Sequence, residues 1–183
     1  YKRNSLAVSF RKKENKIVAL LVPVIDHPFF AKFAYYVEDE LDKNGYSLIV
    51  SSSQSRQSKE YAMIEKLKKK DVDGIIFVTH YDYRNEELSK YPVVSVDRHF
   101  DNVPFVTSNN YDSSVLACEW LVSEGCRKIA YLGGKTLVES EVMERERAYR
   151  AVMQRHGLEE IVKCEVVKHG GEQPMVEELF SEH

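Results

Sequence analysis

The segment Lys16–Tyr36, KIVALLVPVIDHPFFAKFAYY, constrains the fold of this chain more than any other. It opens with an apolar run, 17–22, which is too short to cross a membrane as a helix. After a polar turn that holds Asp26, apolar residues recur with the period of a helix. A continuously apolar strand followed by an amphipathic helix is typical of a parallel α/β sheet. Because ligands bind beyond the carboxyl ends of such strands, we expect residues 23–30 to form one wall of a ligand site.

The alternation of strand and helix continues along the chain and predicts an α/β fold with two lobes. It indicates right-handed βαβ units, with each lobe a parallel sheet flanked by helices and a cleft between the lobes. The lobes are expected to join near residues 107–110. In the first lobe, strands are predicted at 17–22, 47–51, 75–79, 92–96 and 105–108. One helix is predicted to begin at residue 29, a second to span 59–70 and a short third to lie near 85–90.

The second lobe is predicted to be incomplete in this chain. Two strands make a poor sheet, so we expect the natural polypeptide to continue past His183. On the first helix of this lobe, Leu116, Ala117, Trp120 and Leu121 are expected to face inward. The predicted helices are 110–124, 140–156 and 173–180, and the predicted strands are 128–132 and one near 165–167.

Composition favours a soluble, cytoplasmic protein. Apolar residues make up 43% of the chain and charged residues 30%, as in ordinary globular domains. Neither a long apolar span nor a secretory leader is evident, so we expect no membrane association. Cys118, Cys126 and Cys164 lack CxxC spacing and are expected to be reduced thiols, without a metal or a cofactor.

The first 16 residues form a basic arm. They hold six basic residues against Glu14, whereas the chain as a whole has a net charge of −3. A basic arm on an acidic body suggests that the arm contacts nucleic acid, although a solvated leader would have the same composition. Residues 4–10, NSLAVSF, have the pattern of a short helix that needs a partner to be ordered.

Polar side chains follow three of the predicted strands. Asp26 follows the first, Thr79-His80 ends the third and Asp97-Arg98 follows the fourth. In a parallel sheet these ends lie side by side, so we expect their side chains to converge on one edge. Together with Phe29 or Phe30 they suit a small hydroxylated or planar ligand. Two alternatives stay open: Asp97-Arg98 as a local ion pair, and which of the two phenylalanines belongs to the core.

Signatures of enzymes are scarce, and we expect no catalytic activity. Gly134-Lys135-Thr136 is similar to the end of a phosphate-binding loop, but Ile129 stands where that loop needs glycine. Motifs of the GxGxxG, GxSxG and HExxH types are missing from the sequence. Most of the histidines adjoin predicted turns, which favours solvated roles over metal binding.

Eight segments, in order, resemble the LacI/GalR family of bacterial transcription regulators. They are NSLAVSF with its basic linker, KIVALLVPVIDHPFF, NGYSLIVSSS, DVDGIIFV, PVVSVDR, VTSNNYDSS, EGCRKIAYLGG and RERAYRAVMQRHGL. The resemblance implies a type I fold like that of periplasmic sugar-binding proteins, and a homodimer that binds operator DNA. It also implies a helix-turn-helix domain before Tyr1. The organisation expected is a hinge helix and linker at 1–15, an amino-terminal lobe at 16–108 and part of a carboxy-terminal lobe at 109–183.

The resemblance also assigns roles to single residues. Residues 4–10 match the hinge helix that orders on the operator, with DNA contacts implied for Asn4, Ala7 and Phe10. Phe30 matches an effector-stacking position, and Asp97-Arg98 match a polar pair in the effector site. Arg145 and Ser140 are further implied effector contacts. Asn109 departs from the family, which commonly has aspartate there, and Cys126 replaces its usual histidine.

The sequence therefore predicts the effector-binding core of an allosteric repressor that senses a sugar or sugar derivative. The competing prediction is a solute-binding protein of a sugar transport system, which the basic arm and the missing signal peptide disfavour. The identity of the effector, and whether it induces or co-represses, are left open at this point.

Overall fold

The computed structural model describes residues 15–83, 88–134, 139–165 and 172–182. The chain divides into two compact units, unit 1 (Tyr1–Val106) and unit 2 (Thr107–His183). Asn4, Ala7 and Phe10 of the predicted hinge lie outside the described residues. The functional division at 15 and 108 stays a prediction, and each unit is described by itself below.

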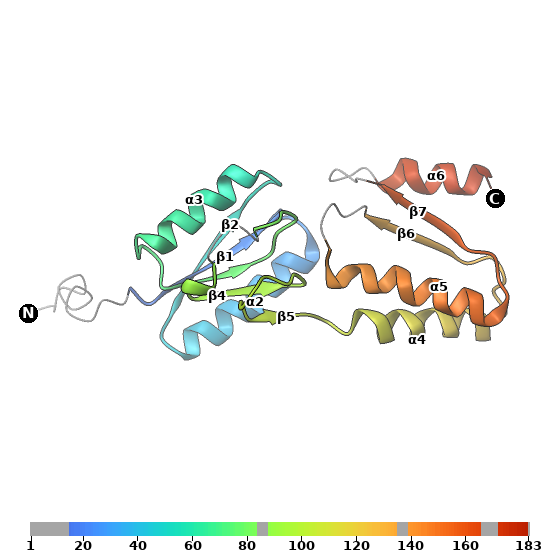
Figure 1. The fold of residues 1–183 in the computed structure, drawn as a ribbon, viewed down its shortest axis with the longest axis horizontal. Coiled ribbons are helices and arrows are strands. Elements are labelled where there is room, and N and C mark those ends of the chain that lie inside the picture. The colour runs from blue at the N-terminus through green and yellow to red at the C-terminus, as the bar shows by residue number, and fades with distance from the viewer. Residues whose placement is uncertain (1–14, 84–87, 135–138, 166–171, 183) are drawn as a thin grey trace, which may run out of the picture. The chain divides into compact units, whose positions relative to one another are not determined.

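Unit 1 contains a parallel five-stranded sheet, which confirms the predicted α/β class (Figure 1). The strand order β2-β1-β3-β4-β5 places the first strand of the chain inside the sheet, with the second at its edge. Every neighbouring pair is parallel, with Val18 of β1 opposite both Leu48 and Gly74. The strands are β1 (Ile17–Val22), β2 (Ser47–Ser52), β3 (Gly74–Phe77), β4 (Val93–Val96) and β5 (Phe105–Val106).

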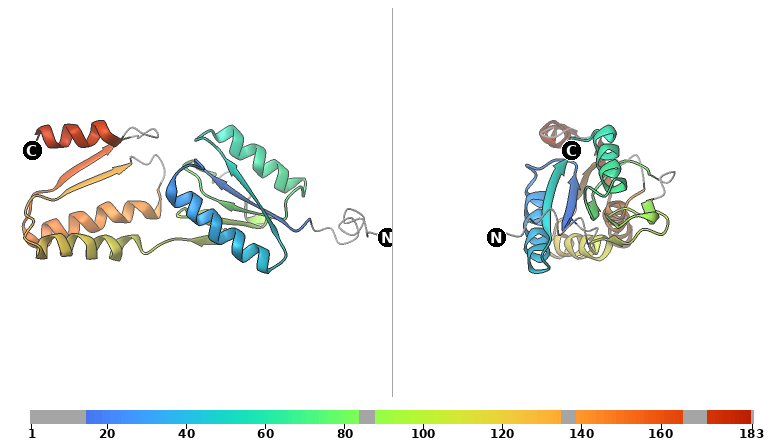
Figure 2. Two further views of the ribbon diagram at one scale, coloured as in Figure 1. Left: turned by 180° about the vertical axis from the view of Figure 1, so that it is seen from behind. Right: turned by 90° about the vertical axis from the view of Figure 1, so that its left-hand side faces the viewer.

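Two helices cover opposite faces of this sheet, α2 (Pro28–Lys43) and α3 (Gln57–Lys68) (Figures 1 and 2). The alternation of side chains along β1 assigns the faces, because successive residues of a strand point to opposite sides. Leu20 and Val22 belong to the apolar cluster that α2 covers, while Leu21 packs with the buried residues of α3. This two-sided burial is the reason that the strand is apolar throughout.

Local sequence accounts for where α2 starts. Pro28 occupies the first turn, where its fixed backbone angle suits a helix and its missing N–H is not needed. The Nδ1 atom of His27 accepts a hydrogen bond from the Phe29 amide at 3.2 Å and so acts as the N-cap. Of the helix predicted near 85–90, the described part is a 3₁₀ turn, η1 (Leu88–Lys90).

Unit 2 pairs two parallel strands, β6 (Ala130–Gly134) and β7 (Ile161–Glu165), in the part of the chain that is described. Helices α4 (Asn110–Ser123) and α5 (Glu144–His156) pack against each other, and Gly157 ends α5 with a left-handed residue. A 3₁₀ turn, η2 (Glu141–Met143), precedes α5. Helix α6 (Glu172–Glu182) lies beside β7, where Lys163 forms an ion pair with Glu178 at 2.6 Å.

Two predictions for unit 2 are wrong in position. The strand expected near 165–167 lies at Ile161–Glu165, because the pairing with β6 and the bonds of Tyr149 described below select that register. On α4, Leu116 and Trp120 are 71% and 62% exposed rather than inward. Ala117 is exposed as well, whereas Leu121 packs inward as predicted, beside Val115 and Cys118.

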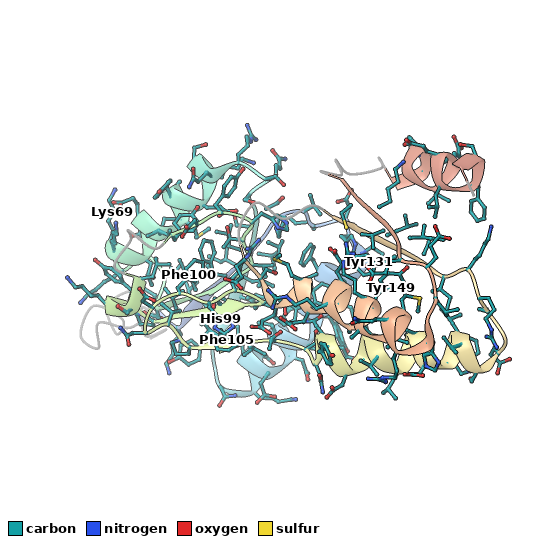
Figure 3. All side chains as sticks on the ribbon, turned by 45° about the vertical axis from the view of Figure 1, so that its right-hand side comes forward. Lys69, His99, Phe100, Phe105, Tyr131 and Tyr149 are labelled. Carbon is teal, nitrogen blue, oxygen red and sulfur yellow. The ribbon has the colours of Figure 1, made fainter. Side chains whose placement is uncertain are left out.

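Tyr149 joins the two strands of unit 2 from α5 (Figure 3). Its buried hydroxyl lies 2.7 Å from the Ile129 carbonyl oxygen, 3.2 Å from that of Ile161 and 2.8 Å from the Ile161 amide nitrogen. Burial raises the pKa of this phenol, which keeps it neutral and able to donate.

Replacing Tyr149 by phenylalanine is expected to lower the free energy of unfolding by about 1–3 kcal/mol, because buried backbone groups lose their partner. Urea unfolding of the intact protein measures this. The control is Tyr131→Phe, since the hydroxyl of Tyr131 has no hydrogen-bond partner among the described residues. Equal stability of the two variants would contradict the role of Tyr149.

The described residues include no helix that is both long and apolar enough to cross a membrane.

Candidate functional site

The strand order brings the predicted polar ends together. Asp26 follows β1, Thr79-His80 follows β3 and Asp97-Arg98 follows β4, and these three strands are neighbours in the sheet. All are parallel, so their carboxyl ends share one edge, as the sequence predicts. We call this the carboxyl edge of unit 1. A ligand site at this edge stays a prediction.

Arg98 is the most constrained side chain of the carboxyl edge. It is only 3% exposed, and its Nε atom donates to the Thr79 carbonyl oxygen at 3.0 Å. The hydroxyl of buried Ser95 donates to the Arg98 carbonyl oxygen at 2.5 Å. Burial lowers the pKa of Arg98, against the opposing effect of the nearby carboxylates of Asp82 and Asp97. The hydrogen bond to Thr79 therefore fixes the orientation of the guanidinium, which bridges the ends of β3 and β4.

Asp97 adopts a left-handed backbone conformation, with φ of 57°. Its amide donates to the Val106 carbonyl oxygen at 2.9 Å, which ties it to β5. Residues other than glycine rarely take this conformation, and such residues cluster at ligand sites. Two further examples, Gln54 and Ser55 with φ of 51°, lie in the loop after β2, which leaves the same edge of the sheet.

A buried carboxyl group lies behind the carboxyl edge, and sequence reasoning missed it. Glu60 of α3 is 1% exposed, and its Oε2 atom accepts hydrogen bonds from the Thr79 hydroxyl at 2.5 Å and the Tyr83 hydroxyl at 2.8 Å. The Thr79 hydroxyl also accepts from the Tyr81 amide at 3.0 Å. Burial and the Glu60 carboxyl group raise the pKa of Tyr83. These bonds fix Thr79, whose carbonyl in turn holds Arg98.

A sequence signal for Glu60 exists. It stands three, four and seven residues before Met63, Ile64 and Leu67, which are the buried residues of α3, so helical periodicity places it on the apolar face. An acidic residue on such a face needs hydrogen-bond donors. The sequence does not show which donors those are, because Thr79 and Tyr83 meet Glu60 only through the packing of α3 on β3.

Asp26 and His80 are more exposed members of the carboxyl edge. Crowding by protein atoms lowers the pKa of His80, and the positive charge of Arg98 lowers it further. His80 therefore presents a neutral imidazole near pH 7, which can donate or accept a hydrogen bond.

The structure separates the two phenylalanines that periodicity could not. Phe30 is half-buried and packs on the apolar cluster that includes Leu20 and Val22, whereas Phe29 is 53% exposed. The rings of His27 and Phe29 each lie 5.3 Å from that of Phe30 between centroids. After β4, the His99 ring lies 3.9 Å from that of Phe105 (Figure 3). The stacking role of Phe30 stays a prediction.

Arg145 and Ser140, the other predicted contacts, belong to unit 2. Arg145 of α5 is exposed, and its Nε atom donates to Oδ1 of buried Asn110 at 2.6 Å. Asn110 Nδ2 in turn donates to the Ser108 carbonyl oxygen at 3.1 Å. Ser140 is buried and caps η2 by accepting from the Val142 amide at 3.2 Å. Ser140 thus has a structural role. The hydrogen bond from Nε to Asn110 fixes the orientation of the Arg145 side chain.

Asn109 stands where the family commonly has aspartate, and it is the N-cap of α4. Its Oδ1 accepts from the Asp112 amide at 3.2 Å, and its Nδ2 donates to the Asp112 carboxylate at 2.8 Å. The side chain of Asn109 therefore accepts from a backbone amide in the first turn of α4 and also donates to a carboxylate. An ionised aspartate at this position could only accept.

The described residues contain no group of three or more acidic, histidine or cysteine side chains placed to hold a metal ion. What the carboxyl edge offers is one oriented guanidinium, the side chains of two aspartates, a neutral imidazole and aromatic faces. Such a set recognises a small polyhydroxylated molecule through hydrogen bonds and ring contacts.

Comparison with known proteins identifies the family. Residues 15–183 match the model of the periplasmic binding proteins and sugar binding domain of LacI family. The chain belongs to the LacI family. This confirms the resemblance seen in the sequence, together with the type I periplasmic-binding-protein-like fold.

Relatives of this LacI-family chain include two named repressors. The sucrose operon repressor of Streptococcus mutans is 34% identical over 157 residues, which is 83% of this chain and 48% of the relative. The ribose operon repressor of Bacillus subtilis is 36% identical over 135 residues, 73% of this chain and 41% of the relative. The chain thus spans about half the length of these relatives or less.

A solved structure of similar fold is the periplasmic binding protein/LacI transcriptional regulator from Alkaliphilus metalliredigens QYMF, complexed with D-xylulofuranose. It is 28% identical, with a TM-score of 0.75 over 84% of this chain and 58% of that structure. The chain therefore covers only part of the domain found in that structure.

Proposed function

We propose that this chain is the effector-sensing part of a DNA-binding transcription repressor that responds to a sugar or a sugar derivative. The observation that carries the proposal is the convergence of Thr79, Asp97 and Arg98 on one sheet edge in a LacI-family chain. The named repressors of sucrose and ribose operons, and the related structure with D-xylulofuranose, support a sugar as ligand.

In this proposal each side chain makes the kind of contact with the sugar that its functional group allows. The Asp97 carboxylate accepts hydrogen bonds from sugar hydroxyls, and the Arg98 guanidinium donates them as a fork fixed by the Thr79 carbonyl. Asp26, His80 and Thr79 add polar contacts, and Phe29 or Phe30 covers the apolar face of the sugar ring. Arg145 and Ser140 are further effector contacts implied by the family resemblance, and Ser140 also caps the turn before the helix of Arg145.

The link to DNA rests on the sequence and on the relatives. The proposed regulator is a cytoplasmic homodimer without enzymatic activity. Its hinge residues Asn4, Ala7 and Phe10 contact operator DNA beside a helix-turn-helix domain. An effector that binds two conformations with different affinity shifts their populations, and this changes operator affinity by the same coupling free energy.

A thermal-shift screen of the intact protein tests the sensing function, with D-ribose, sucrose, D-glucose and fructose 1-phosphate as probes. A ligand present at one hundred times its dissociation constant stabilises the native state by about 2.7 kcal/mol, which is readily detected. The variant Phe30→Ala/Asp97→Ala is expected to lose that response. A double variant that responds like the wild type would refute the site.

A gel shift with the intact protein and the DNA upstream of its own gene tests the regulatory function. The expected result is that the protein retards this DNA and that the identified sugar weakens or strengthens the binding. A protein that binds a sugar from the screen but no DNA would instead be a solute-binding protein, the competing prediction from the sequence.

A further inference from the structure

The carboxyl end of α3 carries exposed lysines that the proposed function does not use. We call three of them the α3 lysine cluster: Lys66 in the last turn of the helix, Lys69 at its C-cap and Lys70 directly after it (Figure 3 labels Lys69). None of the three is paired with a carboxylate among the residues that the structure describes. Their neighbour Lys68 differs, since it forms an ion pair with Glu65 at 3.0 Å.

The cluster lies where the chain enters unit 1. The side-chain amide of Asn15 donates to the Lys70 carbonyl oxygen at 2.5 Å, and the backbone amides of Asn15 and Ile17 donate to the two Asp73 carboxylate oxygens at 3.0 Å each. Asp73 is thus occupied by backbone groups, which leaves Asp71 as the acidic side chain next to the lysines. Directly before Asn15, residues 1–14 hold five basic side chains against one acidic.

The helix dipole does not by itself account for this cluster. Lysines at a helix carboxyl end are favourable, typically by a modest amount, so one or two are expected there. Helix α2 also ends with a lysine, but that lysine is paired with carboxylates. At the end of α2, Lys43 pairs with Asp39 at 2.8 Å and with Glu40 at 3.4 Å, and the end of that helix is acidic. Of the carboxyl ends of these two helices, only that of α3 therefore has several lysines that are not paired with a carboxylate among the described residues.

We propose that the α3 lysine cluster contacts phosphates of duplex DNA, extending the basic surface of residues 1–16 onto the folded unit. This rests on the proposed function, in which residues 1–14 reach the operator. Lysine ammonium groups act on phosphates as point charges, so the contacts position the protein and add affinity without reading sequence. The duplex is expected on the α3 side because the end of α2 would repel it.

Salt dependence of DNA binding by the intact protein tests the inference. Fluorescence anisotropy with a labelled 30-base-pair duplex of mixed sequence gives the slope of log affinity against log salt between roughly 50 and 200 mM KCl. Each lost phosphate contact reduces that slope by about 0.9, so Lys66→Gln/Lys69→Gln is expected to reduce it by about 2 per protomer. Circular dichroism checks that the variants are folded.

The matched control lies at the other end of the same helix. Arg56→Gln/Lys59→Gln removes the same charge at the amino end of α3, where both side chains donate to the Gln54 side-chain oxygen, and is expected to leave the slope unchanged. Equal loss in both variants would show a net-charge effect and overturn the inference. An unchanged slope in the lysine variant overturns it while the proposed function stands. A wild-type protein without DNA affinity overturns both.

Discussion

Replacing Glu60 by alanine is expected to lower the free energy of unfolding by about 3–5 kcal/mol, because two buried hydroxyl groups lose the acceptor that they share. The Thr79 and Tyr83 hydroxyls both donate to its carboxyl group, and neither can reach water. The cavity left by the side chain adds to the loss. Urea or thermal unfolding of the intact protein measures it.

A variant and a control separate the hydrogen bonds from general effects on α3. Glu60→Gln keeps an acceptor oxygen and the volume of the side chain, and is expected to lose roughly 1–2 kcal/mol. Glu65→Ala removes an exposed glutamate from the same helix and is expected to change stability by about 0.5 kcal/mol or less. A Glu60→Ala protein as stable as Glu65→Ala would show that the buried network contributes nothing.

Exchanging Arg98 for lysine is expected to weaken binding of the sugar by about 100-fold, or roughly 2.7 kcal/mol. Lysine keeps the charge but not the planar fork, so it cannot hold the Thr79 carbonyl and donate to sugar hydroxyls at the same time. Titration calorimetry with D-ribose and sucrose measures the affinity, and a melting curve without sugar measures stability separately.

Arg56→Lys serves as the control for that exchange. Arg56 is an exposed arginine of unit 1 that donates a hydrogen bond to the side-chain oxygen of Gln54, so its exchange should leave sugar affinity unchanged. If Arg98→Lys binds the sugar as tightly as the wild type, Arg98 holds the sheet edge together and does not contact the ligand.

The three inner strands of unit 1, β1, β3 and β4, were predictable because each is buried on both faces and is therefore an almost continuous apolar run. In β1 the residues from Ala19 to Val22 are nearly inaccessible, and the same pattern marks β3 and β4. Sequence order then placed Asp26, Thr79 and Asp97 at strand ends. The parallel topology, which the strand–helix alternation indicates, put those ends on one edge.

Prediction failed where a residue's neighbours come from elsewhere in the chain. Trp120 has the spacing of an inward residue, yet α4 turns Cys118 to the core because α5 packs on that side. The polar residues Lys163 and Glu165 obscured β7, whose register depends on Tyr149. Neither contact is local, so no short-range pattern contains it.

By itself the sequence determined the α/β class, the family and the polar groups at the strand ends, since these depend on local periodicity and on the order of segments. Only the tertiary structure decided that Glu60 supports Thr79, that Thr79 holds Arg98 and that Phe30 is the more buried of the two phenylalanines. The physical reason is the packing of α3 on β3. It brings together side chains 19 and 23 positions apart, and the hydrogen bonds between them form only once water is excluded.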